Sequence, residues 1–132
     1  MSEENVEVVR RAYEAFNRRD WDAAFRDQAP DVEYTTPPRG PTAGRYRGRE
    51  EIQGFWAEML TAFDAASVEP EEFFERGDQV AVVVRTRMRP KGSSAEIERR
   101  TGALWKIRDG TVVSIRIFAK PEEALDAVGL EE

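Results

Sequence analysis

The chain has 132 residues, 40% of them hydrophobic and 35% charged, a balance typical of one soluble globular domain spanning residues 1–132. It contains no cysteine and no histidine, which excludes disulfides, thiolate chemistry and the commonest general base and metal ligand. The formal net charge of -6 argues against a nucleic-acid partner, because nucleic-acid binding normally needs a basic face.

The start of the chain, MSEENVEVV, has neither the basic residues nor the apolar stretch of a signal peptide. No apolar run approaches the length of a membrane-spanning helix. We therefore expect a cytoplasmic protein with no membrane partner.

Two helices and a strand are predicted between Val6 and Pro38. In the first helix, apolar side chains recur three and four positions apart, which gives one apolar face formed by Val6, Val9, Tyr13 and Phe16. Asp20 then caps a short second helix. Residues 32–36 alternate and are rich in β-branched and aromatic types, which predicts a strand that ends at two prolines.

Residues 37–48 are rich in proline, glycine and arginine and are predicted to be irregular. Their arginines, with Arg39 among them, suit a solvated surface better than an anion clamp. A third helix, over residues 49–63, carries a wide apolar stripe of Ile52, Phe55, Trp56, Met59, Leu60 and Phe63. Such a stripe usually belongs to the core, although the Trp56 indole N–H needs a partner if it is buried.

The second half of the chain is mostly strand, predicted at residues 67–75, 79–88, 95–107 and 111–118, before a short helix at 122–128. Asp109-Gly110 is the clearest hairpin signal. The run Val80–Val84 is apolar on both faces, so its strand is central in a sheet or lies partly in a subunit interface. Helices followed by strands predict an α+β fold with an antiparallel sheet.

Several phrases in this order resemble the SnoaL-like branch of the nuclear transport factor 2-like (NTF2-like) superfamily. They are Tyr13–Trp21 (YEAFNRRDW), Pro30–Tyr34 (PDVEY), Tyr46–Glu50 (YRGRE) and Glu123–Leu130 (EALDAVGL). The resemblance implies a cystatin-like cone: a curved antiparallel sheet wrapped around three N-terminal helices, with a short C-terminal helix and a pocket at the open end. It also implies a homodimer formed through the outer sheet face, which agrees with the apolar run Val80–Val84.

The same resemblance implies no particular reaction, because members include isomerases, cyclases, epoxide hydrolases and proteins without demonstrated activity. The strand-end aspartate that serves as base in ketosteroid isomerases corresponds here to Thr36, which cannot abstract a proton near neutral pH. The isomerase tyrosine that holds the oxyanion corresponds to Ala12, and its partner acid falls near Ala103. Catalytic residues are therefore unknown, and the comparison leans away from an enzyme.

The candidates for a ligand pocket are aromatic, hydroxylic or cationic: Tyr13, Tyr34, Thr36, Trp56, Arg85 and Trp105. A tyrosine near a threonine can orient a small polar ligand or water, but neither hydroxyl titrates near neutral pH. Without histidine, cysteine or clustered acids, no metal is expected, and no cofactor is implied.

Three hypotheses follow. The favoured one is a homodimer that holds a small apolar or amphipathic molecule and has no assigned reaction. The first alternative is an isomerase, cyclase or epoxide-hydrolase type enzyme that polarises a small hydrophobic substrate with Tyr13, Tyr34 and Arg85. The second alternative is a non-catalytic dimerisation module whose cone is filled by side chains.

Overall fold

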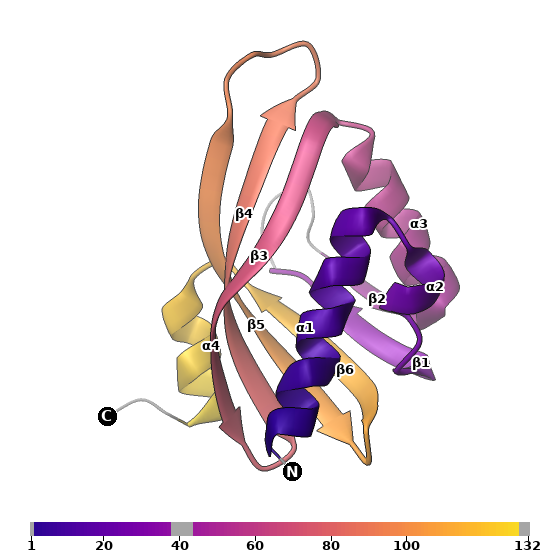
Figure 1. Cartoon of the computed structure of the whole chain (residues 1–132), viewed down its shortest axis with the longest axis vertical. Coiled ribbons are helices and arrows are strands. Elements are labelled where there is room, and N and C mark those ends of the chain that lie inside the picture. Colours follow the sequence, from indigo (N-terminus) through magenta and orange to yellow (C-terminus); the bar gives the residue numbers. More distant parts are fainter. Residues whose placement is uncertain (1, 38–43, 130–132) are drawn as a thin grey trace.

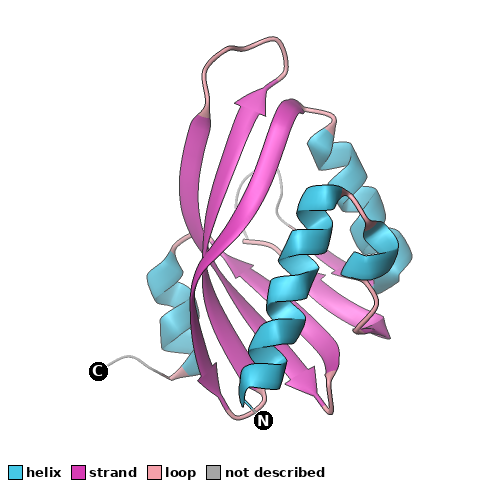
Figure 2. Ribbon diagram, in the orientation of Figure 1, coloured by secondary structure: helices cyan, strands magenta, loops and turns pink. Residues whose placement is uncertain are grey.

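The computed structural model describes residues 2–37 and 44–129. Along the chain its elements are α1 (Ser2–Arg18), α2 (Trp21–Ala24), β1 (Gln28–Thr35), β2 (Arg45–Arg47), α3 (Gly48–Leu60), β3 (Phe63–Arg76), β4 (Gln79–Pro90), β5 (Ile97–Arg108), β6 (Thr111–Phe118) and α4 (Pro121–Val128). Figures 1 and 2 show long, curved strands with α1 lying across one face and α4 on the other. The predicted α+β cone is confirmed. None of the helices in the described ranges is long and apolar enough to cross a membrane.

Within the described residues, the strands form one six-stranded sheet in the order β2-β1-β6-β5-β4-β3. Strands β3 to β6 pair as successive antiparallel neighbours, as expected. The pairing of β1 with β6 differs, because these two strands run parallel. A short hairpin forces two neighbouring strands to be antiparallel, but β1 and β6 are joined through the rest of the chain. Their connection therefore allows either direction.

The larger core lies between the concave face of the sheet and helices α1 to α3. Val80, Val82 and Val84 of β4 point into it, with less than a tenth of each exposed. Because successive strand residues point to opposite faces, Ala81 points to the convex face, where it packs with Ala124 of α4. The two-sided apolar pattern of β4 is thus accounted for inside one chain and does not by itself require a second subunit.

Gly102 of β5 allows α4 to lie this close to the sheet. A Cβ placed on Gly102 would be 2.8 Å from the Ala124 Cβ and 3.1 Å from the Pro121 Cα. Contacts between carbon atoms normally lie at 3.5–4.0 Å. The missing side chain of Gly102 is therefore what brings α4 onto the strand.

The prediction of residues 37–48 as irregular is wrong at its end, because Arg45–Arg47 forms β2 and pairs with β1. Residues 38–43, with Arg39 and the predicted end of the first strand at Pro38, lie outside the described residues. The helix predicted for 49–63 ends at Leu60, and Phe63 begins β3. The strand predicted for residues 67–75 thus begins earlier, at Phe63, because this end of β3 pairs with the end of β4 at Pro90.

Two of the arginines around this segment are held by carboxylates of the same chain. Arg47 pairs with Glu33 at 2.7 Å, and Arg49 pairs with Asp22 at 2.6 Å. Both arginines are well exposed. These pairs agree with a solvated surface and give no support to an anion clamp at Arg47 or Arg49.

Candidate functional site

Tyr13 extends from α1 to the concave face of the sheet, where it meets Trp105 of β5. The Trp105 Nε1–H donates a hydrogen bond of 3.2 Å to the Tyr13 hydroxyl oxygen. The two rings meet edge to face, with centroids 5.5 Å apart. Burial raises the pKa of Tyr13, and the hydrogen bond from Trp105 opposes only part of that rise. The phenol is therefore neutral at physiological pH and can donate a hydrogen bond, but it cannot serve as a base.

Trp56 of α3 stands at the centre of an aromatic cluster that joins the three N-terminal helices to β1. Its ring centroid lies 5.1–5.8 Å from the rings of its neighbours, which are Phe16, Trp21, Phe25 and Tyr34. Burial raises the pKa of Tyr34, and a hydrogen bond from Trp56 offsets part of the effect. Tyr34 and Trp56 thus lie together in an apolar, ring-lined region.

Thr36 follows Tyr34 on the same face of its chain segment and is buried. Its backbone N–H and its Oγ1 both donate to the Gly44 carbonyl, at 2.9 and 3.1 Å. The Thr36 side chain therefore holds the two ends of the intervening segment together. This accounts for its burial without a ligand.

Arg85 lies on the convex face, apart from the other candidates, because its neighbour Val84 points into the core. Its Nε is 3.0 Å from Glu71, and its two terminal nitrogens lie 3.7 Å from Glu69 and 3.5 Å from Glu98. The structure therefore pairs Tyr13 with Trp105 and Tyr34 with Trp56 on the inner face. It places Arg85 in an ion-pair network outside.

A cavity of about 380 Å³ lies between α1 and β3, and Tyr13 borders it. The other lining residues are Arg10, Glu14, Asn17, Ser67, Val68, Glu69 and Pro70. Asn17 spans the gap beside it: its Oδ1 accepts from the Val68 N–H at 2.9 Å, and its Nδ2 donates to the Val68 carbonyl at 2.7 Å. The amide thus takes the place of a neighbouring strand at the free edge of β3.

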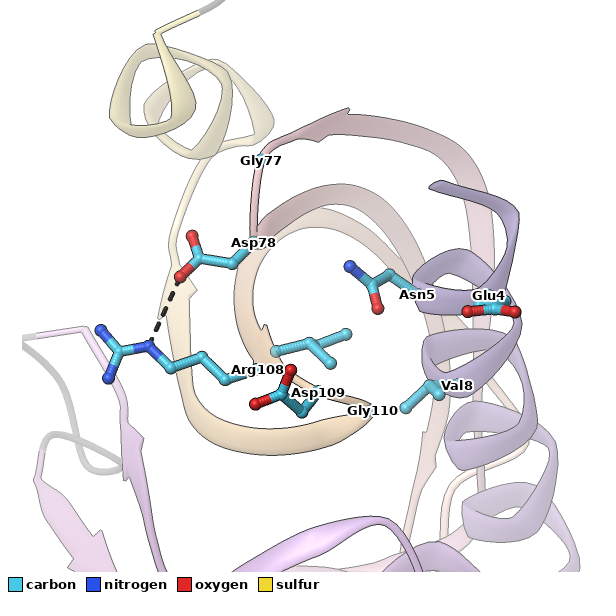
Figure 3. Close-up of a pocket in the computed structure, with 9 residues that line it drawn as sticks. Glu4, Asn5, Val8, Gly77, Asp78, Arg108, Asp109 and Gly110 are labelled. Atoms are coloured by element: carbon cyan, nitrogen blue, oxygen red, sulfur yellow. Dashed lines mark ion pairs between the residues drawn. The ribbon is translucent and has the colours of Figure 1, made fainter. Parts of the chain in front are cut away.

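A second, more polar cavity, of about 580 Å³, lies where the start of α1 faces the β3–β4 and β5–β6 turns (Figure 3). Asn5, Asp78 and Asp109 surround its opening, and Arg108 pairs with Asp78 at 3.5 Å. The described residues contain no group of three or more acids placed to hold a metal ion. Sequence reasoning identified the two turns, but no local signal shows that they meet α1.

A curved sheet wrapped around helices is also the fold of solved structures described as NTF2-like or as cystatin-like. Within this class, the model of the SnoaL-like domain family matches residues 9–115, and the chain belongs to that family. No curated protein matches the chain.

Three similar solved structures illustrate the range of the fold. An NTF2-like protein of unknown function from Burkholderia pseudomallei K96243 is 26% identical, with a TM-score of 0.79 over 96% of this chain and 98% of that one. TerC, co-crystallised with polyporic acid, is 23% identical, with a TM-score of 0.81 over 95% and 97% of the two chains. Rv0760c from Mycobacterium tuberculosis, in complex with estradiol-17beta-hemisuccinate, is 16% identical, with a TM-score of 0.74 over 86% and 92%. The last two likenesses are evidence of the fold alone.

Proposed function

We propose that this SnoaL-like protein binds a small, mostly apolar or amphipathic molecule between α1 and the concave face of the sheet, without catalysing a reaction on it. The observation that carries the proposal is the position of Tyr13. It borders the cavity beside β3 and also contacts Trp105 inside the cone. A small-molecule site usually combines apolar surface with a few fixed polar groups. The Tyr13 ring, Val68 and Pro70 supply the apolar part of the lining here.

The two acids of β1 favour binding over catalysis. On β1, Val32 and Tyr34 point inward, so Glu33 points outward, where it pairs with Arg47 at 2.7 Å. The hydrogen bond and charge of Arg47 hold the pKa of Glu33 below its usual range, and Asp31 is exposed. Neither carboxyl is a candidate general base for a substrate inside the cone, because a base must reach the proton that it removes.

Similar proteins support the choice of ligand. TerC was co-crystallised with polyporic acid, and Rv0760c was solved with estradiol-17beta-hemisuccinate. We extend from these only the expectation that a small organic molecule occupies the same fold. The pocket residues for this ligand are proposed to be Tyr13 and Trp105, with Tyr34 and Trp56 behind them.

A homodimer through the outer sheet face is part of the proposal. Beside α4 this face carries an ion-pair network in which Glu71, only 16% exposed, contacts Arg85 at 3.0 Å and Arg100 at 2.8 Å. Alternating charges of this kind can be complementary to a second copy of themselves across a twofold axis. A cytoplasmic location stays a prediction.

Native mass spectrometry of freshly purified protein tests both parts of the proposal. A dimer of the 15.1 kDa chain with a bound small molecule is expected. Val68→Phe, which fills the cavity between α1 and β3, should abolish the bound mass. Ser94→Phe, in the exposed loop between β4 and β5, is the matched control and should retain it. Wild-type protein that carries and accepts no small molecule would refute the binding role, and a monomer would refute the dimer.

A further inference from the structure

We infer that Arg99 of β5 recognises the acidic group of the ligand, and that the ligand is a small amphipathic carboxylate. The inference rests on the proposed binding function and names the class of ligand for that site. It follows from the face of the sheet on which Arg99 lies and from the side chains around it.

Arg99 lies on the concave face of the sheet. Ala103 and Trp105 of the same strand are buried in the core on that face, and each is an even number of residues from Arg99. In the sheet, Arg99 pairs in register with Thr86 of β4, and Thr86 pairs with Val68 of β3. The three side chains therefore form one row across the concave face, from Arg99 to Val68, which borders the cavity beside α1.

The concave face is accessible beside this row. Figure 1 shows the end of the β4–β5 hairpin extending beyond α1 and α3. Ile97, the next residue of β5 on the same face, is 42% exposed. It pairs in register with Met88 of β4, and Met88 pairs with Ala66 of β3; both partners are half-buried. The row of Arg99 is thus flanked by apolar side chains that a ligand can reach.

The arginines on the two faces of the sheet differ in their partners. Arg100, which follows Arg99 and points to the convex face, lies 2.8 Å from Glu71. Arg87, also on the convex face, lies 3.5 Å from Glu98. Within residues 2–37 and 44–129, Arg99 makes neither an ion pair nor a hydrogen bond. Its guanidinium is therefore available to an anion from outside the chain, and its planar fork fits the two oxygens of a carboxylate.

The spacing of the row indicates the size of the ligand. Neighbouring strands lie about 4.8 Å apart, so the backbones of Arg99 and Val68 are separated by about 10 Å. A bicyclic ring system that carries one carboxylate fits this length. Its rings would lie over Val68 and Thr86, at the cavity beside α1, while its carboxylate reaches Arg99. The concave face thus combines an apolar surface with one unpaired cation, which is complementary to an amphipathic anion.

The test compares 2-naphthoate with 2-naphthamide, which share their rings and differ in charge, by NMR titration of the intact protein. Arg99→Gln should weaken 2-naphthoate binding about fivefold, the scale of an exposed charge pair, and should leave 2-naphthamide binding unchanged. Arg99→Lys keeps the charge and should retain most of the preference for 2-naphthoate. The matched control is Arg89→Gln, which removes the same charge from an exposed residue of the convex face and should alter neither affinity.

Salt dependence gives a second measurement. Added NaCl should weaken 2-naphthoate binding to the wild-type protein, because salt screens exposed charges, and this effect should largely disappear in Arg99→Gln. An unchanged 2-naphthoate affinity in Arg99→Gln, or an equal loss of both affinities, overturns the inference and leaves the pocket standing.

Two further outcomes separate the inference from the proposed function. Loss of the dimer in Arg99→Gln, with the 2-naphthoate affinity unchanged, would show that a second copy of the chain covers this face, and would overturn the inference. Failure of both compounds to bind the wild-type protein also overturns it, and native mass spectrometry then decides the proposed function separately.

Discussion

Replacing Gly102 with alanine tests the close docking of α4 on the sheet. The added Cβ would lie 2.8 Å from the Ala124 Cβ, and two backbone atoms of the helix start, the Pro121 Cα and the Lys120 carbonyl oxygen, lie at 3.1 and 3.2 Å. Overpacking of this kind costs roughly 1–3 kcal/mol. Alanine in place of glycine recovers about 0.5–1 kcal/mol of backbone entropy. We expect a net loss of about 1–2 kcal/mol, which lowers the Tm of a chain this size by about 5 °C.

Urea and thermal unfolding measure this loss, and two further variants sharpen the result. Gly54→Ala lies on the exposed side of α3, where a Cβ meets no atom within 4 Å, and should instead stabilise by about 0.5–1 kcal/mol. Ala124→Gly should cost less in the Gly102→Ala background than alone, because it removes the nearest clashing atom. If Gly102→Ala is as stable as wild type, the helix does not dock at the observed distance and the reasoning fails.

Three other changes follow from contacts described above. Glu71→Gln should lower the free energy of unfolding by roughly 1–2 kcal/mol, because Arg85 and Arg100 lose their charged acceptor. The control Glu72→Gln, on the exposed surface, should change it by less than about 0.5 kcal/mol. Equal effects of the two substitutions would contradict the role of the ion-pair network. Asn17→Ala should cost roughly 1–2 kcal/mol and increase self-association in sedimentation experiments, because the Val68 backbone becomes free to pair with another chain. Burial raises the pKa of Tyr13 in the folded chain above its value in the unfolded chain, which is near 10. The folded state therefore keeps its full stability below about pH 10 and loses stability as the pH rises further, because only the unfolded chain then releases the Tyr13 proton. Between about pH 9 and 11, the free energy of unfolding should therefore fall less steeply with pH for Tyr13→Phe than for the wild-type protein. Equal slopes for the two proteins would argue against a buried hydroxyl.

Local patterns were sufficient for much of the fold. The hairpin at Asp109-Gly110 forms as predicted, with φ of 51° and 79°, the left-handed values that a two-residue turn of this kind requires. The parallel pairing of β1 with β6 and the early start of β3 at Phe63 were not predictable in the same way. Both depend on which distant strand lies alongside, and that choice is made by the packed sheet rather than by neighbouring residues.

The candidate site was predictable as a set of residue types but not as an arrangement. Tyr13 and Trp56 were identified from helix periodicity, yet nothing local shows which ring each one meets. Arg85 is a candidate by its residue type alone. The run Val80–Val84 before it is apolar on both faces, so the sequence does not show which face is the inner one. The packing of the helices resolves this, since Val84 lies in the core against helices α1 to α3 and Ala81 packs with Ala124 of α4 on the opposite face.

The bond between Tyr13 and Trp105 joins residues 92 positions apart in the chain, and the Asn17–Val68 contact spans 51 positions. The first helix can therefore form early, but its inner contacts must wait until β3 and β5 exist. Contacts of such long range require closure of large loops, which slows folding relative to helical bundles of similar stability. We expect a chain that stops before β5 to expose the apolar face of its first helix, which makes the N-terminal third the region most in need of protection during synthesis.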